Sequence, residues 1–155
     1  MCTFHSLGIR ILREEHKHAG LKARFSILDA TDTYGLVQQL YGTTDKQLIR
    51  KAQSVISLWK NGLVDPDAAL AQATSEDEGQ IARLYKSYEA TLAAYQAVDF
   101  DDLILKPTRL LAGNDEVRNR WQNRLRYLLV DEVTVMLFYA KHAVGLQSVL
   151  NVMHI

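Results

Sequence analysis

Residues 127–132, Tyr127-Leu128-Leu129-Val130-Asp131-Glu132, place two acids directly after an aliphatic run. The run is too short for a helix face and is typical of a strand buried on both sides. Open α/β folds bind ligands at the carboxyl edge of a parallel sheet, where both acids would lie. Asp131 suits Mg²⁺ on phosphates, and Glu132 suits a base or a residue that positions water. The segment indicates a nucleotide site, although many strands end in an acid that only caps a turn.

A nucleotide site of this kind also needs a phosphate-binding loop with the pattern Gly-x-x-x-x-Gly-Lys-Ser/Thr, which supplies backbone N–H groups and a cation. None of the eight glycines is followed by Lys-Ser or Lys-Thr. If Asp131 and Glu132 belong to an NTPase, the chain carries only the acidic half of its site.

The composition fits about one domain, because 155 residues with 48% hydrophobic content can form a core. Basic and acidic residues number 18 each, so bulk charge does not indicate a nucleic-acid partner. The single Cys2 excludes an internal disulfide framework. No apolar stretch reaches the roughly 18 residues of a membrane span, and the N-terminus does not resemble a signal peptide. We therefore expect a cytoplasmic protein without a membrane partner.

Helical patterns dominate and predict a mainly α fold. We expect a helix from about His5 to His18 and a brief extended segment at residues 25–28. Capping and stop residues mark the other helices. Asp29 or Thr31 would begin a helix that ends near Gly42, and a Thr44–Gln47 capping box would begin one that ends at Gly62. Asp65-Pro66 would begin a short helix, and a Ser75–Glu78 capping box would begin a helix of about six turns. Asp99 and Asp102 would begin a helix with a kink or break at Pro107, and Asn114 would begin one that contains Val117, Trp121 and Leu125.

Two further patterns have structural interpretations that we favour over binding. A stripe of three tyrosines and a leucine at helical spacing is more typical of core packing than of stacking on bases. A group of arginines near Asp115 and Glu116 is more typical of a solvated face than of a DNA patch. The stripe consists of Tyr85, Tyr88, Leu92 and Tyr95, and the arginines are Arg109, Arg118, Arg120, Arg124 and Arg126.

Three stretches resemble motifs of the UvrD/Rep group of superfamily 1 DNA helicases. Thr3-Phe4-His5-Ser6-Leu7-Gly8-Ile9-Arg10-Ile11-Leu12 resembles its Thr-Phe-His motif. Val98-Asp99-Phe100-Asp101-Asp102-Leu103-Ile104 resembles the segment that returns to its motor domain. Trp121-Gln122-Asn123-Arg124-Leu125-Arg126-Tyr127-Leu128-Leu129-Val130-Asp131-Glu132 resembles its Walker B region. The order and intervals match over about residues 3–132, and Leu58-Trp59-Lys60-Asn61 makes the chain more similar to the Rep side of the group.

The resemblance implies a domain division. In this family a RecA-like motor domain, 1A, is interrupted by a helical insertion called 1B. By position, residues 1–24 would be part of 1A, residues 25–97 the 1B-like subdomain, residues 98–132 a part of 1A that ends in the Walker B strand, and residues 133–155 a divergent tail. The expected fold is therefore mainly α, a helical 1B-type subdomain with a small remnant of a RecA-like α/β domain.

The resemblance also implies an ATP-dependent motor that moves 3′→5′ on single-stranded DNA and unwinds forked DNA in replication or repair. Carried over by position, Asp131 would hold Mg²⁺ on the ATP phosphates, and Glu132 would orient or deprotonate the attacking water. Thr3 and His5 would lie on the single-strand track, where a hydroxyl and a ring N–H suit phosphate or sugar contacts.

Four basic residues on the 1B-like helices are the candidates for contact with a duplex backbone. They are Lys46, Arg50, Lys51 and Lys60, of which Lys46, Arg50 and Lys60 are the predicted site residues.

The tail departs from the family pattern. Asp131-Glu132 runs into Val133-Thr134-Val135-Met136-Leu137-Phe138, whereas the family continues Asp-Glu-Tyr/Phe-Gln-Asp-Thr-Asn. The Gln and Asp that line the ATP site are therefore absent. We expect a helicase fragment that is inactive alone and binds neither ATP nor Mg²⁺ by itself, with a tail produced by a frameshifted or truncated gene or by an artefact.

Two alternatives remain open from the sequence. The chain could be a stand-alone helical module that binds DNA or a partner protein, or that self-associates through uncovered apolar surface. It could also be a metal-dependent nuclease that uses Asp131 and Glu132 with Asp99 or Asp101.

Overall fold

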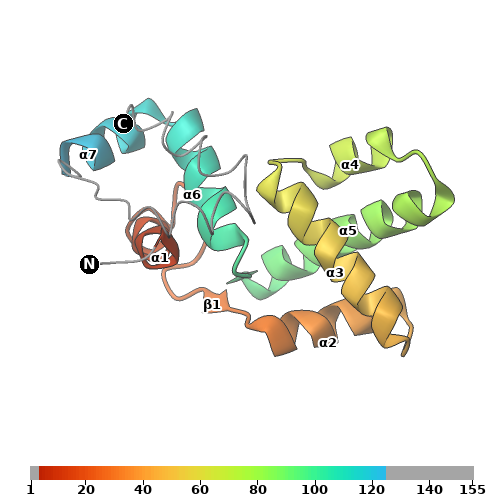
Figure 1. The fold of residues 1–155 in the computed structure, drawn as a ribbon. Helices are drawn as coiled ribbons and strands as arrows, with labels where there is room; N and C mark the ends of the chain where they lie inside the picture. Colours follow the sequence, from red (N-terminus) through yellow and green to blue (C-terminus); the bar gives the residue numbers. More distant parts are fainter. Residues whose placement is uncertain (1–3, 125–155) are drawn as a thin grey trace, which may run out of the picture. The chain divides into compact units, whose positions relative to one another are not determined.

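The chain folds into helices and one small sheet (Figure 1). The structure, a computed structural model, describes residues 4–124. The prediction of a mainly α fold is confirmed, while the strand predicted at residues 127–130 lies outside the described residues. Along the chain the elements are α1 (Phe4–Glu14), β1 (Ser26–Ile27), α2 (Ala30–Tyr41), α3 (Lys46–Asn61), α4 (Pro66–Gln72), α5 (Glu76–Tyr95), β2 (Ala97–Val98), α6 (Asp102–Gly113) and α7 (Asp115–Arg124).

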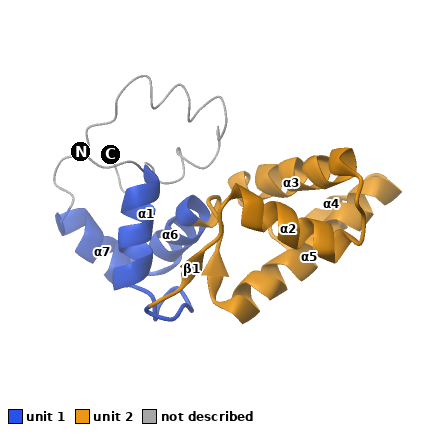
Figure 2. Ribbon diagram, turned by 90° about the horizontal axis from the view of Figure 1, so that it is seen from below, with its two compact units in different colours: residues 1–23, 103–155 blue, residues 24–102 orange. Residues whose placement is uncertain are grey.

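The chain divides into two compact units, coloured separately in Figure 2. Unit 1 comprises residues 1–23 and 103–155, and unit 2 comprises residues 24–102. Unit 2 is thus one continuous stretch that interrupts unit 1 in the sequence. Its limits lie one residue before and five residues after those predicted for the 1B-like subdomain.

A two-stranded parallel sheet marks the two points where the chain crosses into and out of unit 2. Ser26 of β1 pairs with Ala97 of β2, and Ile27 pairs with Val98. The backbone N–H of Leu28 donates to the carbonyl of Val98 at 2.8 Å. The brief extended segment predicted at residues 25–28 is confirmed, and β2 supplies the partner that the sequence did not reveal.

The helix starts of unit 2 follow capping chemistry, which satisfies the first N–H groups of each helix. Of the two predicted caps, Asp29 and Thr31, Asp29 caps α2, in a reciprocal capping box with Asp32. The predicted Thr44–Gln47 box is wrong, because the Asp45 carboxylate accepts from Gln47 N at 2.8 Å and takes that place. Ser75 caps α5 as predicted.

The core of unit 2 lies where α2, α3, α4 and α5 pack on one another. The tyrosine stripe is mostly core, as favoured, since only Tyr95 is exposed. The buried face of α3 carries Ile49, Ala52 and Ile56 at spacings of three and four residues. The cluster also contains Leu36, Val37, Ala69, Ile81, Ala82, Leu84, Tyr85, Tyr88, Leu92 and Ala97.

In unit 1, α1 and α6 approach very closely at Gly8. A methyl group built on Gly8 would lie 1.8 Å from the carbonyl oxygen of Leu103, so only glycine fits there. Pro107 lies inside α6 and has no N–H to donate to that carbonyl. The sequence predicts a kink or a break at Pro107, and the break is wrong, because α6 continues through Pro107 to Gly113.

The core of unit 1 combines residues from α1, α6 and α7. Helix α1 ends at Glu14, before the predicted His18, and hydrogen-bonded turns follow it. Asn114 caps α7 through Val117 N at 3.0 Å, as predicted. The cluster contains Leu7, Ile11, Leu111, Val117 and Trp121. Of the helices in residues 4–124, none has both the length and the apolar character needed to cross a bilayer.

Candidate nucleic-acid interface and a buried lysine cluster

Three of the sequence-predicted site residues have no structural description. Thr3, Asp131 and Glu132 all lie outside residues 4–124. Their assigned roles therefore stay predictions. His5 is described, and it lies in the first turn of α1, partly buried.

Two of the three predicted site residues for duplex contact share an exposed face. Lys46 and Arg50 are four residues apart near the start of α3, a spacing that places both on one side of a helix. Within the described residues no carboxylate forms an ion pair with either side chain, whereas the adjacent Lys51 pairs with Asp77 at 3.3 Å. Lys46 and Arg50 thus present two cations on the surface of unit 2.

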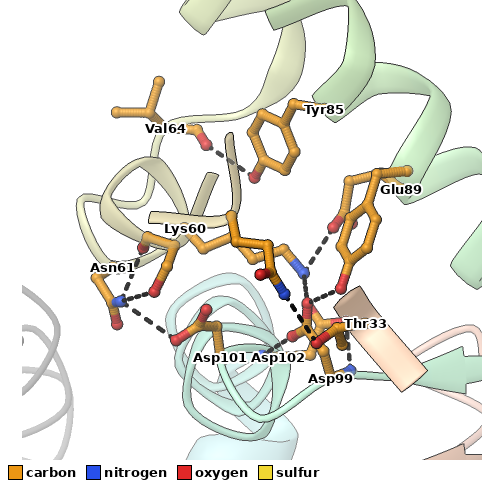
Figure 3. Close-up of polar contacts among 12 residues, drawn as sticks. Thr33, Lys60, Asn61, Val64, Tyr85, Glu89, Asp99, Asp101 and Asp102 are labelled. Carbon is orange, nitrogen blue, oxygen red and sulfur yellow. Dashed lines mark hydrogen bonds and ion pairs between the residues drawn. The ribbon is translucent and has the colours of Figure 1, made fainter. Parts of the chain in front are cut away.

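The third predicted contact, Lys60, is wrong as a DNA ligand because its side chain is fully buried. Figure 3 shows its ammonium among three carboxylates. Lys60 Nζ lies 2.7 Å from Asp99 Oδ2, 3.1 Å from Asp102 Oδ1 and 2.7 Å from Glu89 Oε1. These four residues are called the lysine cluster below. Its ammonium is committed to the protein interior and is not presented to a phosphate.

Each carboxylate of the lysine cluster comes from a defined element. Glu89 comes from α5, Asp99 directly follows β2, and Asp102 is the first residue of α6. The Tyr88 hydroxyl of α5 donates to Asp99 Oδ2 at 2.8 Å (Figure 3). The ammonium of α3 therefore joins α5 and the segment through which the chain leaves unit 2.

The electrostatics of this region follow from burial and from the charge count. Burial alone would lower the pKa of Lys60, but Asp102, Asp99 and Glu89 outweigh it and raise that pKa well above 10.5. Burial, reinforced by Asp99, raises the pKa of the Tyr88 hydroxyl. Lys60 is therefore charged and Tyr88 neutral at physiological pH.

Asp101 occupies a different position beside the cluster. Asn61 Nδ2 donates to Asp101 Oδ1 at 3.2 Å (Figure 3). Burial, followed by the charge of Asp99, raises the pKa of Asp101 above its ordinary 3.8. Asp101 also lines a pocket of about 190 Å³ together with Thr33, Gln53, Ser57 and apolar side chains. The pocket offers hydroxyl and amide groups and two carboxylates, those of Asp99 and Asp101.

The described residues do not form a metal centre. Among residues 4–124, no three His, Cys, Asp or Glu side chains gather as a metal site requires. Asp99, considered for a nuclease, is already bound to Lys60 and Tyr88. The nuclease alternative gains no support from it.

The arginines of α7 are ion-paired, as the interpretation of a solvated face suggests. Arg120 Nη1 donates to the buried Glu15 at 2.7 and 2.9 Å, and Trp121 Nε1 donates to the same carboxylate at 3.1 Å. Arg118 pairs with Asp115 within its own helix. Sequence reasoning missed Glu15, because its hydrogen-bond partners in α7, Arg120 and Trp121, lie more than a hundred residues away in the sequence.

The comparison with known proteins decides the family. The family model of the UvrD/REP helicase N-terminal domain matches residues 1–133. The chain belongs to this family. The resemblance drawn from the three motifs is therefore confirmed, and residues 134–155 lie outside the match.

Several helicases in the family are close relatives. The chain is 48% identical over 133 residues to the ATP-dependent DNA helicase Rep of Escherichia coli strain K12, which covers 84% of this chain and 20% of that protein. Identity to Rep of Salmonella typhimurium is 47%, with the same shares covered. The ATP-dependent DNA helicase PcrA of Staphylococcus aureus strain Mu50 is 34% identical over 136 residues, covering 85% of this chain and 19% of PcrA. The chain spans about a fifth of the length of the curated relatives it matches.

Proposed function

We propose that this chain forms part of the ATP-dependent motor of a DNA helicase that moves 3′→5′ on single-stranded DNA and unwinds forked DNA. The observation that carries this proposal is the 48% identity to a Rep helicase over 133 residues. Unit 2 would be the helical 1B insertion, and unit 1 would be part of the motor domain around it. The single continuous stretch of residues 24–102 inside unit 1 supports that assignment.

The catalytic residues in this proposal are Asp131 and Glu132. A carboxylate is an oxygen ligand of the kind that Mg²⁺ takes, so Asp131 would hold the ion beside the ATP phosphates. Glu132 would orient or deprotonate the attacking water. The sequence holds no phosphate-binding loop with its lysine, so these residues alone do not complete an ATP site.

The DNA contacts in this proposal fall on two segments of the chain. Thr3 and His5 would meet the single strand. Lys46 and Arg50 would meet the phosphates of a duplex, which their exposure and lack of a carboxylate partner in the described residues support. Lys60 is removed from this set because it is buried.

A chimera tests the proposed motor function. Residues 1–133 would replace the matching region of the Escherichia coli relative, and DNA-stimulated ATP hydrolysis and fork unwinding would be measured. We expect both activities, and we expect Glu132→Gln to abolish hydrolysis while DNA binding persists. A chimera that folds and binds DNA but never hydrolyses ATP would contradict the proposal. The chain by itself should show no DNA-stimulated ATP hydrolysis.

The duplex contacts need a separate measurement. Fluorescence anisotropy with a forked duplex would give the affinity of the chimera at several salt concentrations. Each lost phosphate contact should reduce the slope of log K against log salt by about 0.9. We expect that reduction for Lys46→Ala and for Arg50→Ala. The neighbouring Lys51→Ala serves as the control, because Lys51 is already paired with Asp77. Equal slopes for all three variants would exclude this face of α3 as the duplex site.

A second candidate, a helical module that associates with itself, rests on one observation. Leu58 on α3 is 67% exposed, and Leu48 on the same helix is 42% exposed. These side chains would lose water contact in an assembly. Light scattering over a hundredfold range of concentration would detect it as a rising mass. The double variant Leu48→Ser/Leu58→Ser should then stay monomeric.

A further inference from the structure

The acidic segment 99–102 is held by two consecutive residues at the end of α3. Lys60 binds Asp99 and Asp102, and the next residue, Asn61, donates to Asp101 at 3.2 Å (Figure 3). Asn61 Nδ2 also donates to the carbonyl of Ser57 at 2.7 Å, which fixes the amide on its own helix. The three acids of this segment are therefore bound by adjacent side chains of one helix turn.

Asp99 and Asp102 have a second task at the start of α6. The backbone N–H of Asp102 donates to Asp99 Oδ1 at 2.8 Å, and the N–H of Asp99 donates to Asp102 Oδ2 at 3.4 Å. This is the reciprocal pattern of a capping box, in which each side chain satisfies an N–H near a helix start. The two carboxylates that cap α6 are thus the same two that bind Lys60.

The oxygen atoms are divided between these tasks. Asp99 uses Oδ1 for the cap and Oδ2 for Lys60, and Asp102 uses Oδ2 for the cap and Oδ1 for Lys60. A carboxylate that rotated to improve one bond would weaken the other. The ammonium therefore fixes the rotamers in which both acids can cap the helix.

The charge count makes Lys60 necessary for this arrangement. One ammonium faces three carboxylates, and its side chain has no solvent exposure. Without that cation, Asp99 and Asp102 would repel each other across the cap, and water could not screen them fully. The Tyr88 hydroxyl can offset only part of the charge on Asp99.

We propose that Lys60 is a positioning residue that fixes segment 99–102 to the last turn of α3 and to α5, all within unit 2. It makes this segment rigid where the chain leaves unit 2, and the segment held in this way is called the joint below. The joint exists independently of helicase activity. Its use in transmitting motion between a 1B insertion and a motor domain rests on the proposed function.

Hydrogen exchange in the complete chain tests the joint. Lys60→Met keeps an unbranched side chain that is one atom shorter and removes the charge. Because an opening free energy sets the exchange rate, we expect the peptide covering residues 99–106 to exchange at least about tenfold faster. Peptides from the middle of α3 and α5 should change less than about twofold. Lys51→Met, which breaks an exposed ion pair on the same helix, is the control and should leave both regions unchanged.

Two further variants keep the test decisive if Lys60→Met unfolds unit 2. Tyr88→Phe removes one hydrogen bond to Asp99 and leaves Lys60 in place, so it should speed exchange of residues 99–106 by about threefold and spare the helix cores. The double variant Lys60→Met/Asp99→Asn keeps a good cap without the repulsion, and it should recover part of the lost protection.

The outcomes separate the proposal from an ordinary role in stability. Faster exchange confined to residues 99–106, with recovery in the double variant, supports the positioning role. An equal increase throughout α3, α5 and residues 99–106 in both single variants would overturn it, as would no change in residues 99–106. Neither result depends on DNA binding or ATP hydrolysis. Failure of the proposed helicase function would therefore leave the positioning role of Lys60 unaffected.

Discussion

Replacing Gly8 with alanine should destabilise unit 1, although the same change stabilises most helices. The added Cβ would lie 1.8 Å from the Leu103 carbonyl oxygen and 2.9 Å from its carbon. An ordinary contact between carbon and oxygen is about 3.3 Å, so α1 and α6 would have to separate by roughly 1.5 Å. Overpacking of a backbone contact costs about 3 kcal/mol, at the upper end of the usual range. Alanine recovers about 1 kcal/mol of helix propensity. The net loss is about 2 kcal/mol.

Urea unfolding followed by tryptophan fluorescence measures this loss. Trp121 lies in the core of unit 1, and Trp59→Phe as a common background leaves Trp121 as the only reporter. Gly113→Ala is the matched control. Gly113 is likewise a helical glycine of unit 1, in α6, and a Cβ there meets nothing within 4 Å. The control should be neutral or stabilising by up to about 1 kcal/mol. An increase in the unfolding free energy for Gly8→Ala would refute the close contact between α1 and α6.

Three other substitutions have expected outcomes that unfolding experiments can check. Asp101→Asn should raise stability near neutral pH, because burial and then a neighbouring carboxylate raise the folded-state pKa above 3.8. The stability that this carboxyl contributes is fully present below its unfolded pKa and is lost as pH rises through the folded pKa, so the benefit of Asn should vanish toward acid pH. Glu15→Gln should cost about 2 kcal/mol in thermal or urea unfolding, because it weakens the buried charged bonds to Arg120. The exposed Glu14→Gln should cost less than about 1 kcal/mol. Asp29→Ala removes the cap of α2 and should cost about 1 kcal/mol of unit 2 stability, measured by circular dichroism.

Local chemistry was sufficient to predict most helix starts. Asp29, Asp65, Ser75 and Asn114 all act as caps, because a short polar side chain can reach an N–H two or three residues ahead. The error at Thr44 has a local cause too. Asp45 stands next to it, and its carboxylate is the stronger acceptor for the N–H groups of Gln47 and Leu48.

Lys60 shows what the sequence could not reveal. Its neighbours in the chain give no sign of Asp99, which is 39 residues away. One signal was present, since Ile49, Ala52, Ile56 and Lys60 follow the same three- and four-residue spacing as a buried helix face. A lysine in such a row needs carboxylate partners. The acids of segment 99–102 have few cations near them in the sequence, so their carboxylates were available to pair with Lys60.

The candidate site depended on motif recognition more than on physical patterns. Thr3, Asp131 and Glu132 were chosen by their place in family motifs, and their geometry lies outside the described residues. Lys46 and Arg50 were chosen as cations on a helix, and the structure places both on the surface. The burial of Lys60 is visible in the structure because Lys60 and its three carboxylate partners all lie within the described part of unit 2.

The parallel pairing of β1 with β2 has an evolutionary consequence. The strands that open and close unit 2 run side by side, about 4.8 Å apart in an ordinary sheet. A helical body whose two attachment points are neighbours can be acquired, deleted or swapped by recombination with little disturbance to the host fold. Lineages could then diversify the inserted helices while inheriting an unchanged pair of junctions, and grafting experiments could use Ser26 and Val98 as natural splice positions.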